Sequence, residues 1–234
     1  MKAMLLRVGI DTACGGTLGP IFEDGSFEFV PIPEYPGAPR AVPVYSETPG
    51  RWGRVLSTYV PKALIDAPMH YDPEFETCTY GDPTTIKRRY LLKLHQGDLL
   101  VFYAGLKPYK NDVYETALYI IGYFTIDRII DFNESTRKQI AAYCEEFANN
   151  AHLGRDSWYH NLVIASGDKN KSRLLDHAIK ISKRKPNKAG RLTYAISAEM
   201  EQQLGIDCFI ERSVPPRFVV GETYLANLKK ILAE

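Results

Sequence analysis

The sequence lacks any pair of cysteines close enough to form a local metal site. Its four cysteines are more than sixty residues apart from one another: Cys14, Cys78, Cys144 and Cys208. A zinc site built from CxxC pairs is therefore excluded. A chain of 234 residues has no need of disulfides to supply its stability, so reduced thiols are expected.

Net charge and long apolar runs are also missing. The formal charge is only +1, so no global field draws the chain to nucleic acid or to an acidic membrane, and nucleic-acid binding would need a local patch. No apolar run approaches the ~20 residues of a membrane span. The short apolar stretch before Asp11 predicts a first strand instead of a secretory signal. Together these features predict a cytoplasmic protein with no membrane partner.

The chain does contain the material for a substantial core, with 45% hydrophobic residues, 15 Tyr and 10 Phe. Strand patterns dominate residues 1–131, at 4–10, 99–103 and 117–130, with a break expected at Gly122. Helical patterns dominate residues 132–234, and helices are predicted from about 135 to 151, at 171–182, at 194–204 and near the end. This order predicts one α+β domain over residues 1–234, with a mixed β-sheet and helices concentrated in the second half.

The most informative segment for chemistry is residues 69–82, within a long polar loop predicted at 57–89. It places an imidazole, several carboxylates, a thiol and a phenol close together in sequence. Three uses fit: a hard-metal site from His70, Asp72 and Asp82, a hydrogen-bonding rim for a polar ligand, or carboxylates that cap an irregular loop. The spacing matches no known ligand pattern, so the sequence assigns no metal.

Other candidate residues are scattered along the chain. Asp11 follows the first strand, where α/β sheets often place site residues, although it could equally cap a turn. The glycine-rich turn at 15–20 lacks the Lys-Ser/Thr pair of a phosphate loop. Lys87-Arg88-Arg89 and a basic cluster at 180–191 could contact phosphate or could simply be solvated. No GxSxG motif is present, so covalent catalysis is not predicted.

Two apolar segments resemble part of a known domain class. The Gly97-Asp98 turn leads into the strand at 99–103, and the later strand carries an apolar-Gly-aromatic step at 121–123. This arrangement resembles the middle of a PUA-like domain of the EVE and ASCH branches, around residues 97–127. The resemblance implies a PUA-like pseudobarrel as the alternative to an open mixed sheet.

A broader pattern resembles one prokaryotic family over most of the chain. The segments that carry it are Val8-Gly9-Ile10-Asp11, the stretch 19–29, Pro31-Ile32-Pro33, His70, Asp72-Pro73-Glu74-Phe75, Thr79-Tyr80-Gly81-Asp82 and 97–106. They resemble the third of the nucleotide-modification-associated domains, an uncharacterised family. The resemblance implies an association with nucleotide or nucleic-acid modification and brings no established catalytic residues or cofactor with it.

The favoured hypothesis is recognition of a nucleotide or nucleic acid, with a modified base among the candidate ligands. A base would stack on Tyr80 and Tyr103, and polar groups of the loop, including Asp82, would read its edges. Lys87, Arg88 and Arg89 would contact phosphate.

Two other functions stay open on the sequence alone. The chain could be an enzyme of base modification, with Asp11, His70 and Asp72 as acid–base or metal-binding groups. It could instead be a protein-interaction subunit of a modification system that uses the proline-rich arm at 31–49. The cofactor and the oligomeric state are not assigned.

Overall fold

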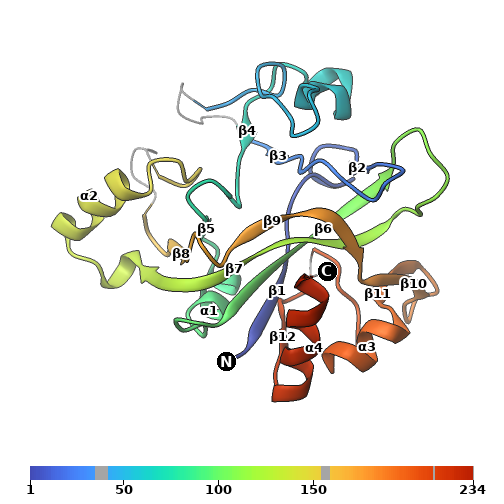
Figure 1. Cartoon of the computed structure of the whole chain (residues 1–234). Coiled ribbons are helices and arrows are strands. Elements are labelled where there is room, and N and C mark those ends of the chain that lie inside the picture. Colours follow the sequence, from blue (N-terminus) through green and yellow to red (C-terminus); the bar gives the residue numbers. More distant parts are fainter. Residues whose placement is uncertain (35–41, 154–158, 213, 234) are drawn as a thin grey trace.

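An eight-stranded mixed sheet forms the centre of the structure, a computed structural model that describes residues 1–34, 42–153, 159–212 and 214–233 (Figure 1). The main path runs β12-β1-β6-β7-β8-β5, while β2 pairs with β6 and β9 pairs with β7. The strands of this sheet are β1 (Ala3–Arg7), β2 (Gly19–Ile21), β5 (Thr79–Asp82), β6 (Leu99–Pro108), β7 (Ala117–Asp131), β8 (Val163–Gly167), β9 (Arg173–Lys180) and β12 (Arg217–Val219).

Smaller elements complete the described chain. Two further sheets have two strands each, one of β3 (Ile32–Pro33) with β4 (Met69–His70) and one of β10 (Ser182–Pro186) with β11 (Leu192–Ile196). The α-helices are α1 (Thr85–Leu91), α2 (Arg137–Glu146), α3 (Ala198–Leu204) and α4 (Glu222–Ala233), and the 3-10 helices are η1 (Leu56–Tyr59), η2 (Lys62–Leu64) and η3 (Phe132–Glu134). Among the described residues, no helix is long and apolar enough to cross a membrane.

The antiparallel pair β6–β7 lies in the middle of the sheet, and it contains the irregularity predicted at Gly122. Phe102 lies opposite Gly122 while the next residue, Tyr103, lies opposite Ile120, so one residue of β7 is left over as a bulge. The position needs glycine, because a Cβ on Gly122 would lie 2.7 Å from the ring of Phe75. The expected break in the strand at Gly122 is thus confirmed as a bulge within one continuous strand.

The predicted α+β class with a mixed sheet is confirmed, and three of the four described α-helices follow Asp131. The alternative of a closed pseudobarrel is not what the described chain forms. Its sheet has parallel pairs (β1–β6 and β2–β6) beside antiparallel ones, and the end strands β12 and β5 are not paired with each other. A barrel would need that pairing to close.

Two predicted helices are wrong in whole or in part. Residues 173–180 form β9, which pairs with β7 next to the stretch of β7 that β8 covers, so long-range pairing overrides the local helical spacing. The helix predicted at 194–204 begins only after strand β11, where Ser197 caps α3 by accepting from the N–H of Met200. Its predicted end is confirmed, since Gly205 has the left-handed conformation with φ +64.

The polar loop predicted at 57–89 is more structured than expected, because it contains η1, η2, β4, β5 and α1. The helix predicted from 135 is α2, and it begins after Thr136, which forms a capping box with Gln139. The proline-rich arm lies partly outside the described residues, at 35–41. Within its described part, Tyr45 is fully buried and its hydroxyl donates to Pro31 O at 2.8 Å.

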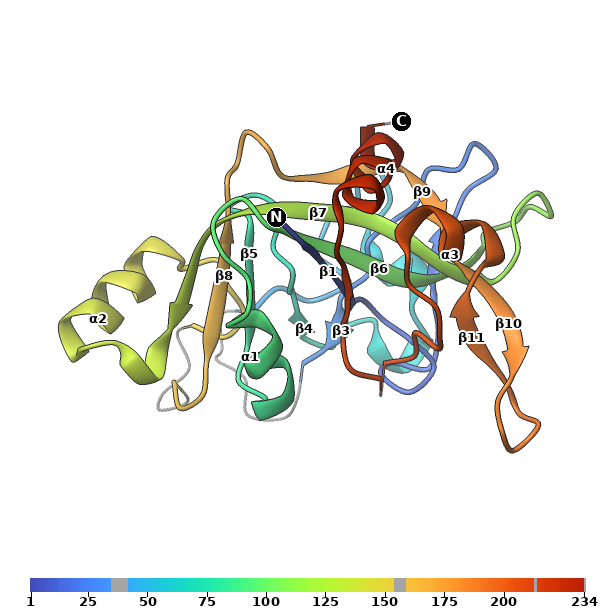
Figure 2. The same cartoon turned by 90° about the horizontal axis from the view of Figure 1, so that it is seen from below.

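Helices and loops cover the sheet on opposite sides. Helices α3 and α4 lie on one side, and the 3-10 helices η1 and η2 with β3 and β4 lie on the other, while α2 extends beyond β7 and β8 (Figures 1 and 2). Besides the main core there are two smaller hydrophobic clusters. One contains Ile10, Val30, Tyr45, Leu56, Tyr59 and Met69, and the other contains Ile130, Phe132, Phe147, Leu153, Leu162 and Ile164. These small clusters anchor β4 and the turn after α2.

Candidate functional site

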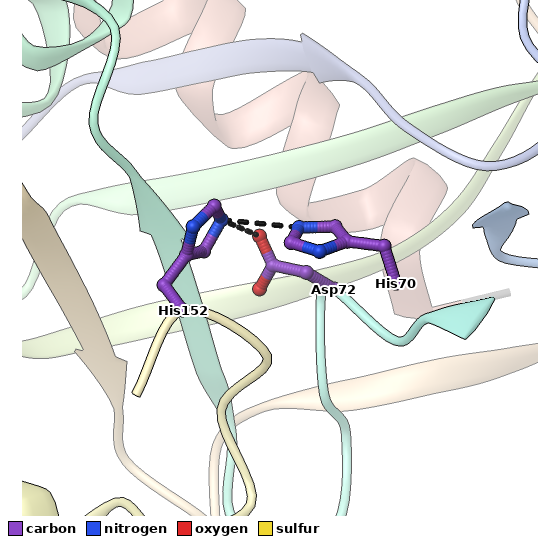
Figure 3. A group of neighbouring side chains, drawn as sticks. All are labelled: His70, Asp72 and His152. Atoms are coloured by element: carbon purple, nitrogen blue, oxygen red, sulfur yellow. Dashed lines mark hydrogen bonds and ion pairs between the residues drawn. The ribbon is translucent and has the colours of Figure 1, made fainter. Parts of the chain in front are cut away.

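Two imidazoles and a carboxylate converge between those anchored segments. His70, Asp72 and His152 point toward one another, and one ligating atom of each lies within 4.8 Å of the other two (Figure 3). The Nε2 atoms of His70 and His152 are 3.1 Å apart, and His152 Nε2 is 3.5 Å from Asp72 Oδ2. We call these three residues the histidine–aspartate cluster.

Local structure fixes each member of the cluster. His70 lies on β4, opposite Ile32 of β3, and the N–H of Asp72 donates to His70 O at 3.0 Å. His152 lies in the turn after α2, where its own N–H donates to the side chain of Asn150 at 3.0 Å. That turn is held by Leu153, which packs in the cluster under α2. Residues 82 positions apart thus meet because separate small cores hold their backbones.

Buried polar groups surround the cluster and orient it. Glu34 Oε2 lies 2.9 Å from His70 Nδ1. The N–H of Gly81 donates to Asp72 Oδ1 at 3.2 Å, and Asn150 Nδ2 lies 3.5 Å from the same oxygen. The side chain of Asp72 is 3% exposed, whereas both imidazoles retain slightly more than a tenth of their surface. The carboxylate is therefore almost completely buried, while each imidazole keeps a small exposed surface.

A second concentration of polar groups lines a cavity of about 280 Å³ that shares no residue with this cluster. Its walls come from β1, α1, β6 and the segment before β12. The lining residues are Leu5, Leu6, Arg7, Thr84, Ile86, Lys87, Tyr103, Arg212, Val214, Pro215 and Pro216. Three of them are cations, and none is a carboxylate. We call this space the basic cavity.

Arg7 is the least satisfied cation of the basic cavity. Its side chain is 9% exposed, its nearest carboxylate oxygen is that of Asp11 at 3.7 Å, and its buried Nε has no hydrogen-bond partner within the described residues. Burial lowers the pKa of Arg7, and the negative charge of Asp11 opposes this effect. A buried guanidinium with spare donors is an arrangement that can bind an anion.

Asp11 does not line this cavity but pairs with two of its cations, Arg7 and Arg212. Its Oδ1 accepts from the N–H groups of Ala13 and Cys14, at 2.9 and 2.7 Å, and its Oδ2 accepts from Arg212 Nε. Burial acts to raise the pKa of Asp11, but the hydrogen bond and charge of Arg212, with help from Arg7, bring that pKa below its ordinary value. Asp11 is thus an ionised partner of two arginines.

Tyr80, Asp82 and Lys87 form a connected group beside the cavity. Lys87 Nζ is 2.9 Å from Asp82 Oδ2, to which the hydroxyl of Tyr80 donates at 3.0 Å. Burial acts to raise the pKa of Asp82, but Lys87 lowers it overall, whereas burial together with the charges of Asp82 and Asp72 raises the pKa of Tyr80. Tyr80 is 3% exposed and packs on Phe102, so its ring belongs to the core.

The residues predicted from sequence therefore fall into two groups. His70 and Asp72 lie in the histidine–aspartate cluster. Tyr103 and Lys87 line the basic cavity. Asp82 and Asp11 pair with lining cations, and Tyr80 donates to Asp82. Burial raises the pKa of Tyr103 to about 12, and its hydroxyl donates to Ile210 O at 3.2 Å.

Arg88 and Arg89 do not line the cavity. Arg88 pairs with Asp131, and Arg89 lies over the ring of Tyr90 at 5.6 Å. The basic run at 180–191 begins at the end of β9 and continues on the β10–β11 hairpin, where Arg184 stacks 3.8 Å above Tyr194.

Sequence reasoning missed His152, Arg7 and Arg212. For Arg7 a signal existed, because a charged residue interrupts the apolar run at 4–10 that was read as a buried strand. His152 and Arg212 follow no local motif, and only the fold brings them to their partners.

These features describe an α+β protein with a polar cluster and a separate basic cavity. The family model of nucleotide modification associated domain 3 matches residues 2–208, so the chain belongs to that family. Comparison with curated proteins and with solved structures gave no match. Arg7, Lys87 and the whole histidine–aspartate cluster lie inside the matched residues, and Arg212 lies just outside them.

Proposed function

We propose that this protein recognises a phosphate-bearing nucleotide, either free or within a nucleic-acid strand, in the basic cavity. The observation that carries the proposal is the convergence of Arg7, Lys87 and Arg212 on a cavity without a lining carboxylate. Membership of a nucleotide-modification-associated family supports this choice of ligand. Guanidinium groups suit phosphate because their planar donors match its oxygens.

The chemistry of the cavity suits both ends of a nucleotide. The cations would hold the phosphate, and the apolar surfaces of Ile86, Pro215 and Pro216 would contact the sugar or base. Binding pockets for small molecules have volumes of roughly 300–1,000 Å³. A cavity of about 280 Å³ is at the small end of that range and suits a single nucleotide unit.

Binding titrations with charge-removing variants test this proposal. We expect Arg7→Gln and Lys87→Gln each to weaken nucleotide binding by about 10-fold or more, since a hydrogen bond to a charged group contributes roughly 1.5–3 kcal/mol. Calorimetry with a nucleoside monophosphate and with a short single-stranded oligonucleotide, with or without a 5′-phosphate, would separate free from polymeric ligands. For the oligonucleotide, we would measure the slope of the logarithm of the binding constant against the logarithm of the salt concentration. Each variant should reduce the magnitude of that slope by about one.

Lys138→Gln is the matched control, because Lys138 is an exposed cation on α2, away from the cavity. It should bind as the unmodified protein does. Binding that is absent even at low salt, or that is equally strong in all three variants, would refute the proposal.

A second candidate is catalysis of nucleotide modification, favoured by the histidine–aspartate cluster, whose imidazoles and carboxylate can transfer protons. Incubation with nucleotides and oligonucleotides, followed by mass spectrometry of the nucleosides, distinguishes the two candidates. For an enzyme, Asp72→Asn should abolish product formation while binding persists. For a recognition protein, no new nucleoside should form, and Asp72→Asn should bind like the unmodified chain.

A further inference from the structure

Two imidazole nitrogens of the histidine–aspartate cluster face each other at a distance typical of two ligands of one metal ion. His70 Nε2 and His152 Nε2 are 3.1 Å apart, and Asp72 Oδ2 is 3.5 Å from the latter. Ligands at ~2.0–2.1 Å from a tetrahedral zinc ion lie about 3.3 Å from one another. Two of the three separations are close to that value, and the third, between His70 and Asp72, is within 4.8 Å. A single ion can therefore contact all three atoms once the His70 and Asp72 side chains move slightly toward each other.

The surroundings of His70 prepare its Nε2 as a ligand. Glu34 Oε2 lies 2.9 Å from His70 Nδ1, and the side chain of Glu34 is 1% exposed. A buried carboxylate at this distance favours the tautomer with hydrogen on Nδ1, which leaves the lone pair of Nε2 directed toward His152 and Asp72. Carboxylate–histidine pairs of this kind commonly orient metal ligands.

The carboxylate of Asp72 is oriented in the same way. Gly81 N–H donates to Oδ1 at 3.2 Å and Asn150 Nδ2 lies 3.5 Å from that atom, while Oδ2 faces the imidazole of His152. Gly81 also allows the close approach of this turn, because a Cβ at that position would lie 2.6 Å from the ring of His152. His70 and Asp72 therefore each have a neighbour outside the cluster that orients the ligating group, and the backbone N–H of His152 is held by Asn150.

We propose that His70, Asp72 and His152 bind one divalent transition-metal ion of the zinc class. Two imidazole nitrogens and one carboxylate oxygen are the ligands that zinc, iron(II) and related ions take, whereas magnesium and calcium prefer oxygen alone. The alternative is a proton shared by His152 Nε2 with His70 and Asp72, and it predicts no metal affinity. The proposed site shares no residue with the basic cavity, so it stands independently of nucleotide binding.

Direct metal titration decides between these alternatives. The full chain would be treated with a chelator, dialysed, and titrated by calorimetry with zinc sulfate and separately with magnesium chloride, in the absence of nucleotide. We expect saturable binding of zinc but not of magnesium, and a zinc-dependent rise in melting temperature. Zinc affinity should fall at least ~10-fold in His152→Gln and Asp72→Asn, and by about 10- to 100-fold in Glu34→Gln, whose carboxylate orients a ligand without being one.

His95→Gln is the matched control, since His95 is an exposed histidine in the turn before β6 and its loss should leave zinc affinity unchanged. Circular dichroism would show which variants fold, and the zinc and magnesium titrations of the unmodified chain need no variant at all. Failure of the unmodified chain to bind zinc would overturn the proposal, as would equal affinity for magnesium or undiminished zinc binding in folded His152→Gln and Asp72→Asn. None of these outcomes would bear on the basic cavity.

Discussion

Replacing Phe102 by alanine is expected to lower the free energy of unfolding by about 3–5 kcal/mol, the range measured for large aromatic truncations in cores. Phe102 lies on β6 with no exposed surface. Its ring centroid is 4.7 Å from that of Phe124 and 5.7 Å from those of Phe75 and Tyr80. Truncation would leave a cavity surrounded by rings that cannot collapse to fill it.

Phe102→Ala should also loosen the polar segment that carries His70 and Asp72, because Phe75 belongs to that segment. Its ring is inserted among Phe29, Phe102 and Phe124, so it joins that segment to the sheet. Chemical denaturation would measure the loss. Val113→Ala, at a side chain that is 61% exposed, is the control and should change stability by less than ~0.5 kcal/mol. A loss below about 1 kcal/mol for Phe102→Ala would contradict this account of the core.

The sequence predicted the elements whose local pattern agrees with their final environment. The apolar strand at 99–103 and the one broken at Gly122 became β6 and β7, and the amphipathic end became α4. The failure at 171–182 has a different origin. Its apolar residues fit a helical face, but the segment lies along an edge of β7 that only the folded sheet provides. Pairing partners fifty or more residues away leave no local trace in a sequence.

The same distinction applies to the candidate site. His70 and Asp72 were identifiable because they lie in one short polar segment. Their third partner, His152, is separated from them by α2 and β7, and only hydrophobic packing under α2 brings it back. Asp11 was singled out as a residue after the first strand, and in the structure it caps the turn at 13–14 and pairs with two arginines. Its ion pairs with Arg7 and Arg212 could not be predicted from the sequence, because the fold is what brings these side chains together.

Asp11→Ala is the second substitution with a large expected effect, about 3 kcal/mol of lost stability. Removing one member of a buried ion pair leaves its partner uncompensated, which typically costs 3–5 kcal/mol. The lower end applies because Arg212 keeps 27% of its side-chain surface, although Arg7 keeps only 9%. Asp11→Asn should cost less, because an amide oxygen can still accept from the N–H groups of Ala13 and Cys14. Denaturant titration of both variants at pH 7 measures the difference.

The pH dependence of that difference follows from the lowered pKa of Asp11. A carboxyl group whose pKa is lower in the folded than in the unfolded chain adds stability above its unfolded pKa, and this contribution is lost as pH falls through the folded value. The stability gap between the unmodified chain and Asp11→Asn should therefore be constant above about pH 5 and shrink below about pH 4. Asp112→Asn, an exposed control, should differ from the unmodified chain by less than ~0.5 kcal/mol at each pH. A gap that widens on acidification would show that Asp11 is not an ionised partner of the arginines.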